Sequence, residues 1–231
     1  GFMWQKTTRE SKKYQLRGEI LSFIPVEKNV EVMLVTITNT GRMAQTVTPT
    51  AAIPLYGRSA DNIRDHRHVT SLLHRIETTD TGVLVTPTLS FDERGHQVNH
   101  MTYYCVGWSG NGEKPVDFYP TAEDFVGEGG NFERPYAIVK NAEGVKAGTK
   151  IEGLEAVGGL HFSEITLEPE EECSYLIFTG ITEDIQEIRN LSKTYTTREM
   201  VLEELEKTKA YWQEKVNVAY HTGDSDFNQF M

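Results

Sequence analysis

The side chains with the greatest capacity for chemistry in this chain are its histidines and its paired carboxylates. His66 and His68 are two residues apart, a spacing at which a strand places two ligands on one face, and His96 and His100 are four residues apart. Neither pair is accompanied by a cysteine or a spaced carboxylate in a recognisable metal pattern. We therefore predict no metal site.

Acidic side chains are neighbours at Asp92 and Glu93 and again at Glu123 and Asp124. General acid and base catalysis needs two such groups that face each other across a substrate with separated pKa values, and adjacency in sequence does not supply that arrangement. We therefore name no catalytic residue and expect most of these carboxylates to be solvated in loops.

Glu128 differs from the other acidic residues because it lies in a glycine-rich segment, residues 127–130. Glycine lets the backbone approach a ligand closely, so Glu128 is a candidate for contact with a sugar or with a neighbouring domain. Phosphate-binding loops join a strand to a helix and carry Lys, Ser or Thr at fixed offsets, which are absent here. The glycines are instead expected to form a tight turn.

Aromatic rings able to stack on a sugar occur together at Tyr103, Tyr104 and Trp108. Adjacent residues of a strand point to opposite faces, so at least one of the two tyrosines is expected in the core. Trp108 is the candidate for stacking. No Ser-His-Asp arrangement or nucleophile elbow can be identified in the sequence.

The composition argues against several classes of partner. The chain has 231 residues, with 23 Lys and Arg against 34 Asp and Glu and a formal net charge of −11. This excess of negative charge repels nucleic acids and anionic membrane surfaces, so neither is an expected partner. No apolar run approaches the ~20 residues of a membrane span, and no signal-peptide pattern is present. Cys105 and Cys173 lie in apolar runs and are expected to be free thiols, which favours the cytoplasm.

Most of the chain consists of short runs rich in β-branched and aromatic residues, separated by turn residues. These runs cover residues 16–24, 30–38, 45–56, 72–78, 83–89, 101–108, 161–167 and 174–179. Many strands without intervening helices predict a mainly β fold, a large antiparallel β-sandwich. Residues 109–150 form a long excursion with one short helical turn after Thr121, and excursions of this length often carry binding elements.

The last quarter of the chain changes to helical periodicity. Thr182 is a candidate cap for a short helix, and Thr196 with Glu199 forms a capping-box pattern before a longer one. We therefore place a β-sandwich domain at residues 1–181 and a helical linker at residues 182–231.

Phe227, Phe230 and Met231 begin an apolar pattern that stops at the chain end. An apolar pattern of this kind is typical of an element that continues, so we expect the chain to be a piece of a longer protein. The alternative is a natural C-terminus that docks on its own domain.

Several short motifs agree in order with those of one enzyme group. They are Phe91-Asp92-Glu93-Arg94-Gly95-His96, Tyr103-Tyr104, Thr121, Phe125-Val126-Gly127, Arg134-Pro135, Gly158-Gly159-Leu160-His161 and Leu167-Glu168-Pro169-Glu170-Glu171. From about Arg17 onward the chain resembles the N-terminal β-sandwich domain of the inverting glycoside phosphorylases. This is the cellobiose and chitobiose phosphorylase group with its β-1,3-glucan and cyclic β-1,2-glucan relatives, formerly glycosyltransferase family 36.

The resemblance implies a galactose-mutarotase-like supersandwich, then linker helices, then a catalytic (α/α)6 barrel beyond Met231. It implies phosphorolysis of β-glucosidic bonds in a β-linked glucan or oligosaccharide to a sugar 1-phosphate. Inorganic phosphate is the co-substrate, and no cofactor is implied. A barrel carboxylic acid would protonate the leaving oxygen, while the non-catalytic sandwich would support and partly wall the active site. A homodimer is implied for the full-length enzyme.

In cellobiose-type members of this group, one loop of the sandwich extends toward the donor sugar and carries an Arg three residues before the Phe of a Phe-x-Gly segment. Here that position is Ala122, and the residues around Glu128 look nearer to the glucan-acting relatives. Thr121, Asp124 and Glu128 of this loop, together with Trp108, are therefore the candidate substrate-binding residues. The alternatives are a free-standing carbohydrate-binding module and an aldose-epimerase-like sandwich, which would need a His and a Glu in one cleft.

Overall fold

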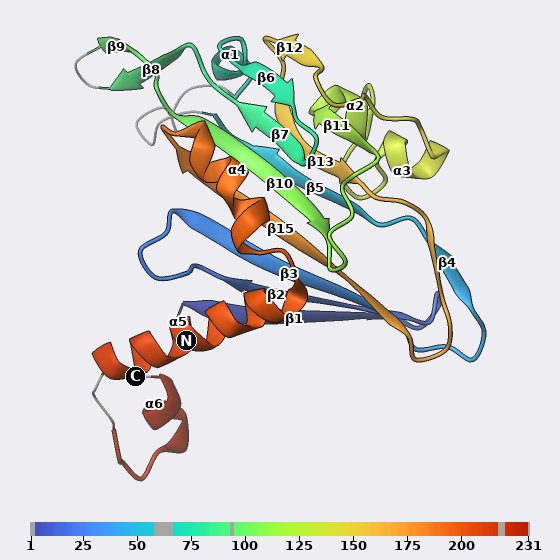
Figure 1. The fold of residues 1–231 in the computed structure, drawn as a ribbon, viewed down its shortest axis with the longest axis vertical. Coiled ribbons are helices and arrows are strands. Elements are labelled where there is room, and N and C mark those ends of the chain that lie inside the picture. Colours follow the sequence, from blue (N-terminus) through green and yellow to red (C-terminus); the bar gives the residue numbers. More distant parts are fainter. Residues whose placement is uncertain (1–2, 58–66, 93–94, 217–219, 231) are drawn as a thin grey trace.

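The computed structural model of the chain describes residues 3–57, 67–92, 95–216 and 220–230. Its described part is mainly β, with two antiparallel sheets stacked face to face and two helices on the outer side of the larger sheet (Figure 1). This architecture confirms the antiparallel β-sandwich followed by helices that the sequence predicts.

The larger sheet has eight strands and is antiparallel throughout. In spatial order they are β1 (Trp4–Ser11), β2 (Leu16–Phe23), β3 (Val30–Asn39), β15 (Glu172–Thr182), β10 (Thr102–Ser109), β7 (Gly82–Val85), β6 (Arg75–Thr78) and β12 (Lys150–Glu152). Strand β15 lies at the centre, where Val30 of β3 and Tyr104 of β10 both pair with Gly180.

The smaller sheet has three strands, β11 (Asp117–Thr121), β13 (Ala156–His161) and β5 (Thr50–Leu55). Two further pairs of strands lie in the described residues, β4 (Gln45–Val47) with β14 (Ile165–Leu167) and β8 (Leu89–Asp92) with β9 (Gly95–Val98). The eight-stranded and three-stranded sheets approach closely at Gly158 of β13, where an added Cβ would lie 2.2 Å from the Cβ of Cys105 of β10. Apolar side chains such as Leu160 and Ile177 fill the space between them.

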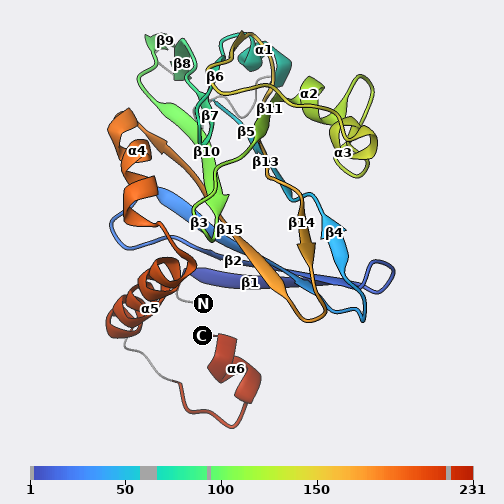
Figure 2. The same ribbon diagram turned by 45° about the vertical axis from the view of Figure 1, so that its right-hand side comes forward.

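The helices are α1 (Arg67–Ser71), α2 (Ala122–Val126), α3 (Tyr136–Lys140), α4 (Ile185–Thr194), α5 (Arg198–Lys215) and α6 (Ser225–Phe230). Figure 2 shows α4 and α5 on one side of the large sheet, with the small sheet, α2 and α3 on the other. A second core joins α4 and α5 to the sheet and includes Trp108, Phe178, Leu191, Tyr195 and Val201. The region predicted as a linker therefore shares a core with the sandwich.

Both helix caps differ from the sequence prediction. Strand β15 continues through Thr182, and α4 begins after Asp184, whose side chain accepts a hydrogen bond from the backbone N–H of Gln186 at 2.8 Å. Helix α5 begins after Thr197 rather than Thr196, and the Thr197 hydroxyl accepts a hydrogen bond from the backbone N–H of Met200 at 3.4 Å.

Several strand boundaries also differ from the predicted runs. The runs at residues 45–56 and 83–89 each divide into two strands of different sheets, with Pro49 and Pro87 in the gaps. Residues 109–150 contain β11, α3 and the start of β12 besides the expected helical turn. Both cysteines are free thiols, with Cys105 buried and Cys173 half-buried.

Candidate functional site

Helix α2 separates two clefts beside the small sheet. The α2 cleft, of about 300 Å³, lies between α2, the 130–132 loop and the ends of β5 and β13. The acidic cleft, of about 360 Å³, lies on the other side of α2, against α3 and residues 142–145. The same excursion of the chain therefore forms part of two adjoining hollows.

Hydrogen bonds at its first residue fix helix α2. The hydroxyl of Thr121 accepts from the backbone N–H of Asp124 at 3.0 Å and donates to its carboxylate at 2.7 Å. Phe125 anchors the helix from below, with its ring centroid 5.8 Å from that of Tyr119. A capping hydroxyl and one buried aromatic residue thus hold a helix of five residues.

The glycine-rich segment after α2 forms a tight turn. Gly127 has φ 77° and Gly129 has φ 68°, a region that L-residues rarely adopt. The backbone N–H of Gly127 donates to the carbonyl of Glu123 at 3.1 Å. At Gly130 an added Cβ would lie 1.9 Å from the carbonyl oxygen of Val126. These positions confirm that the glycines serve the turn.

The structure brings two of the predicted binding residues together and separates the others from them. Asp124 and Glu128 are exposed and line the acidic cleft with Glu123 and Glu143. Thr121 is only 1 % exposed and its hydroxyl is engaged in capping α2. Thr121 therefore acts as a structural residue that positions Asp124.

Trp108 lies in the second core, which joins α4 and α5 to the large sheet, on the opposite face of that sheet from α2. It is 3 % exposed, and its ring stacks on Phe178 with a centroid separation of 4.8 Å. Its indole N–H donates to the carbonyl of Tyr195 at 2.8 Å. Both the ring and the polar group of Trp108 are engaged within the protein, so the structure assigns it to packing instead of sugar stacking.

The α2 cleft contains two aromatic side chains that sequence reasoning did not select. Tyr56 follows β5 and Phe132 lies in the 130–132 loop, and each is 49 % exposed. Ala122, which lies three residues before Phe125 at the position of the Arg in cellobiose-type members, lines the same cleft. Exposed aromatic faces beside a concave wall with a few polar groups are typical of sites that bind small molecules.

His74 and Glu155 also line the α2 cleft. Nδ1 of His74 lies 3.0 Å from the carbonyl oxygen of Leu154, and a carbonyl only accepts, so Nδ1 carries the proton of the neutral ring. Nε2 is then an acceptor, and it is buried without a hydrogen-bond partner among the described residues. Burial lowers the pKa of His74. No local motif marks His74 in the sequence.

The predicted histidine pairs do not form a cluster with other ligands in the described part of the chain. His96 and His100 are exposed near β9, whereas His66 and the side chain of His68 lie outside the described residues. The described residues contain no group of three or more His, Cys, Asp or Glu side chains arranged to hold a metal ion. Among the described helices, none is long and apolar enough to cross a membrane.

Comparison with known proteins identifies one family. The model of the family described as glycosyl hydrolase 94, supersandwich domain, matches residues 2–198. Among solved structures, a polysaccharide lyase is similar over 80% of this chain, with 10% sequence identity and a TM-score of 0.40. The chain spans 22% of the length of that lyase. No curated protein matches the chain.

Proposed function

The chain belongs to the glycosyl hydrolase 94 supersandwich domain family, and from this premise we propose that it is the non-catalytic sandwich domain of a glycoside phosphorylase. The family is one of domains of carbohydrate-active enzymes. In the proposed reaction, inorganic phosphate cleaves a β-glucosidic bond of a β-linked glucan or oligosaccharide. The catalytic acid belongs to a barrel domain of the same protein, and the sandwich forms part of the wall of the active site.

The observation that carries this proposal is the α2 cleft. Its wall contains Ala122, at the loop position that faces the donor sugar in related phosphorylases, and the half-exposed rings of Tyr56 and Phe132. An aromatic face supplies apolar area for the C–H face of a sugar without needing a charged contact. The replacement of Arg by Ala leaves this wall open, which suits a glucan chain better than a single tightly held disaccharide.

The proposed partner of this face is the catalytic barrel. Tyr136, Ile138 and Val139 are each about half exposed, and they lie on α3. A group of exposed apolar side chains is typical of an interaction surface. We propose that the barrel covers this group, that the full-length enzyme is a homodimer, and that it acts in the cytoplasm without a cofactor.

The first experiment compares the 231-residue chain with the proposed longer protein, which carries the barrel domain as well. Each is incubated with β-1,4-, β-1,3- and β-1,2-linked glucose oligosaccharides and inorganic phosphate, and release of sugar 1-phosphate is measured. The longer protein is expected to release sugar 1-phosphate from at least one of them and the chain alone from none. Phosphorolysis by the chain alone would show that its own residues are catalytic, and inactivity of both would refute the phosphorylase assignment.

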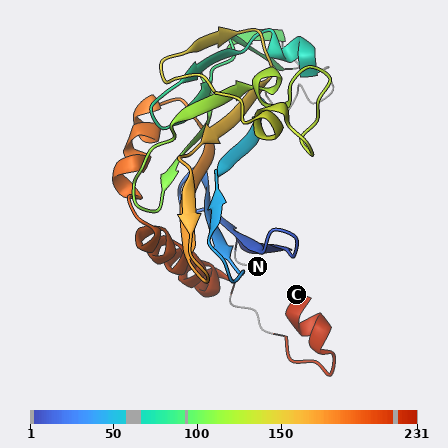
Figure 3. The same ribbon diagram turned by 90° about the vertical axis from the view of Figure 1, so that its right-hand side faces the viewer.

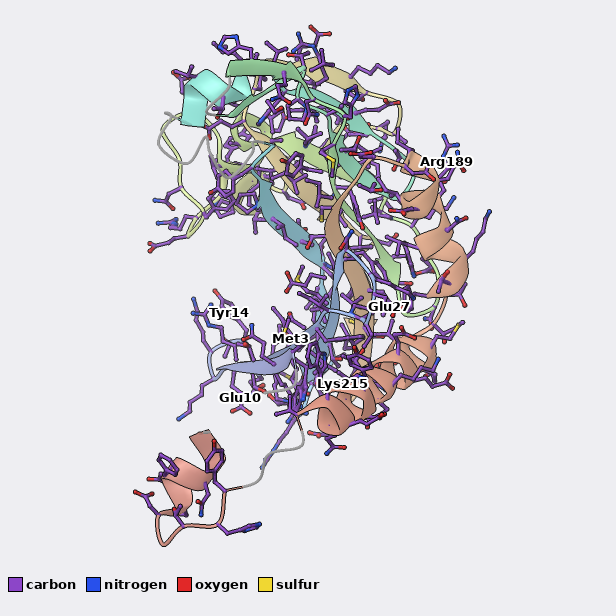
Figure 4. The ribbon with its side chains drawn as sticks, turned by 90° about the vertical axis from the view of Figure 1, so that its left-hand side faces the viewer. Met3, Glu10, Tyr14, Glu27, Arg189 and Lys215 are labelled. Atoms are coloured by element: carbon purple, nitrogen blue, oxygen red, sulfur yellow. The ribbon has the colours of Figure 1, made fainter. Side chains whose placement is uncertain are left out.

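A second experiment tests the cleft in the longer protein. Phe132→Ala removes one aromatic wall, and the loss of about 0.5–1.5 kcal/mol of aromatic contact predicts a KM roughly three- to tenfold higher. Tyr14→Ala is the matched control, because Tyr14 is an exposed aromatic residue near the tip of the β1–β2 hairpin (Figure 4). Equal effects of the two substitutions on KM would argue against a role for the α2 cleft.

One observation favours an aldose epimerase as a second candidate, because His74 and Glu155 line a single cleft. An aldose epimerase uses a base that takes the proton of the anomeric hydroxyl and an acid that protonates the ring oxygen, so that the bond from that oxygen to the anomeric carbon breaks and the ring can close again on the other face. The position of His74 weakens this candidate, since Nδ1 is bonded to Leu154 and Nε2 is buried. Polarimetry with α-D-glucose distinguishes the epimerase from the phosphorylase domain. Faster mutarotation in the presence of the chain, abolished in His74→Ala, would support the epimerase, and an unchanged rate would exclude it.

A further inference from the structure

A separate polar pocket lies on the outer side of the large sheet. The outer pocket, of about 270 Å³, is bounded by the 27–30 loop between β2 and β3, by β10 and by α4. Figure 3 shows α4 on the opposite side of the sandwich from α2 and α3, so this pocket is remote from the α2 cleft. In Figure 4, Glu27 lies on the side of the sheet that carries α4 and α5.

The floor of the outer pocket carries a tyrosine side chain of β10. Tyr104 is 4 % exposed and lines the pocket, and its hydroxyl makes no hydrogen bond to any described residue. The Tyr104 hydroxyl is not among the buried polar atoms that lack a partner, so it reaches solvent at the pocket. A ligand that enters the pocket could form this hydrogen bond in place of water.

Glycine at position 180 makes room for this hydroxyl. Gly180 pairs with Tyr104 across the sheet, and an added Cβ would lie 2.5 Å from the Tyr104 OH and 2.6 Å from the carbonyl oxygen of Asn29. Any side chain at position 180 would displace the phenol from the pocket floor. The absence of a side chain at Gly180 therefore leaves room for the hydroxyl beside the 27–30 loop.

Helix α4 adds polar groups from above. Glu187, Asn190 and Thr194 are spaced three and four residues apart, so they lie on one face of the helix, and all three line the pocket. The Glu187 carboxylate accepts a hydrogen bond from the hydroxyl of Thr182 at 2.5 Å through one oxygen, which leaves its other oxygen available. Burial, with the charge of Glu187, raises the pKa of Tyr104 to about 12, so the phenol remains a donor at neutral pH.

Among the described residues that line the pocket, the one cationic side chain is already engaged. The Lys28 ammonium donates to the hydroxyl of Tyr195 at 2.6 Å and lies 3.5 Å from the carboxylate of Glu204. The other charged groups that line the pocket, Glu27 and Glu187, are acidic. An anionic ligand would therefore be repelled, whereas a neutral ligand with several hydroxyls matches the phenol, the carboxylate and the amides.

We propose that the outer pocket binds one ring of a neutral sugar. One hydroxyl of the sugar accepts a hydrogen bond from Tyr104, a neighbouring hydroxyl donates to Glu187, and Asn190 contacts the rim of the ring. The site would hold a carbohydrate chain on the surface of the domain, away from the place where the proposed reaction occurs. It goes beyond the proposed function, because it requires neither the barrel nor phosphate.

The test is a titration of the ¹⁵N-labelled 231-residue chain with D-glucose, D-galactose, D-mannose and N-acetyl-D-glucosamine, followed by amide chemical shifts. At least one sugar is expected to give saturable shifts at residues 28–30 and 187–194, and D-glucuronate is expected to give none there. Shifts confined to residues 122–132 would place the sugar in the α2 cleft and overturn the proposal. Absence of saturable shifts with all four sugars would also overturn it.

Substitutions then assign the contacts. Tyr104→Phe keeps the ring and is expected to raise the Kd about fivefold, which is the net effect of one neutral hydrogen bond. Glu187→Gln is expected to weaken binding as well. Arg189→Ala is the matched control, because Arg189 lies on the same helix and points away from the sheet (Figure 4). Unchanged affinity in folded Tyr104→Phe would refute the assigned role of the phenol.

Discussion

Substitution of Trp108 by phenylalanine tests whether this residue serves packing or binding. In the structure the indole is buried, stacks on Phe178 and donates a hydrogen bond of 2.8 Å to the carbonyl of Tyr195. Phenylalanine retains an aromatic ring over Phe178 but supplies no donor. Trp108→Phe therefore leaves a buried carbonyl oxygen unpaired and a small void beneath the start of α5.

Two losses set the expected magnitude. An unpaired buried polar group costs about 1–3 kcal/mol. The smaller ring also gives up roughly 50 Å² of buried apolar surface, which at ~25 cal/mol per Å² is worth about 1 kcal/mol. We therefore expect Trp108→Phe to lower the free energy of unfolding by about 2–4 kcal/mol, a large part of the ~5–15 kcal/mol typical of a folded domain.

The assay is urea-induced unfolding followed by far-UV circular dichroism, which does not depend on tryptophan emission. Trp212→Phe provides the matched control, because Trp212 is half-buried on α5 and its ring meets Tyr211 edge-on at 5.4 Å. The control is expected to lose less than about 1 kcal/mol. A Trp108→Phe protein of unchanged stability that no longer responds to sugars would refute the packing role and restore Trp108 as a ligand contact.

Three further predictions concern single positions. Gly158→Ala is expected to destabilise the protein by several kcal/mol, since the new methyl group would lie 2.2 Å from the Cβ of Cys105, and thermal unfolding of the variant measures this loss. Thr121→Ala should cost about 1 kcal/mol, whereas Thr121→Ser should restore most of it, because the serine hydroxyl still caps α2. Burial lowers the pKa of His74 below its unfolded value of 6.5, so the unfolded chain binds the proton first. The stability provided by neutral His74 should be complete above pH 6.5 and lost as the pH falls toward the lowered pKa, and His74→Leu should lack this segment of the curve of urea midpoint against pH.

The strands that the sequence reveals are those with one polar and one apolar face, or with two apolar faces. Strand β3 alternates buried and less buried residues along most of its length, and β10 is buried almost throughout, so both match their predicted runs closely. Strand β1 escaped prediction because six of its eight residues are exposed, which leaves no periodic pattern. Only pairing with β2 shows that it is a strand.

The predicted site depended on residue type, and tertiary packing decided the outcome. Glu128 and Asp124 are on the surface because a short capped helix and a glycine turn place them there, and the sequence carries both signals. Burial of Trp108 depends on α4 and α5 folding back over β10, which no local pattern encodes. For the same reason Tyr56 and His74, distant in sequence from α2, could not be assigned to its cleft.

The central position of β15 determines the order in which the domain can be completed during synthesis. Strands β1 to β3 and strands β6, β7 and β10 all leave the ribosome before β15, yet β15 joins the two groups through β3 and β10. Until residue 182 has emerged, each half-sheet has an unpaired edge facing the place that β15 will fill. Non-local pairing of this kind is slow and exposes strand edges to aggregation. The domain therefore depends on the last of its strands to be made, and protection by chaperones would matter most before that strand emerges.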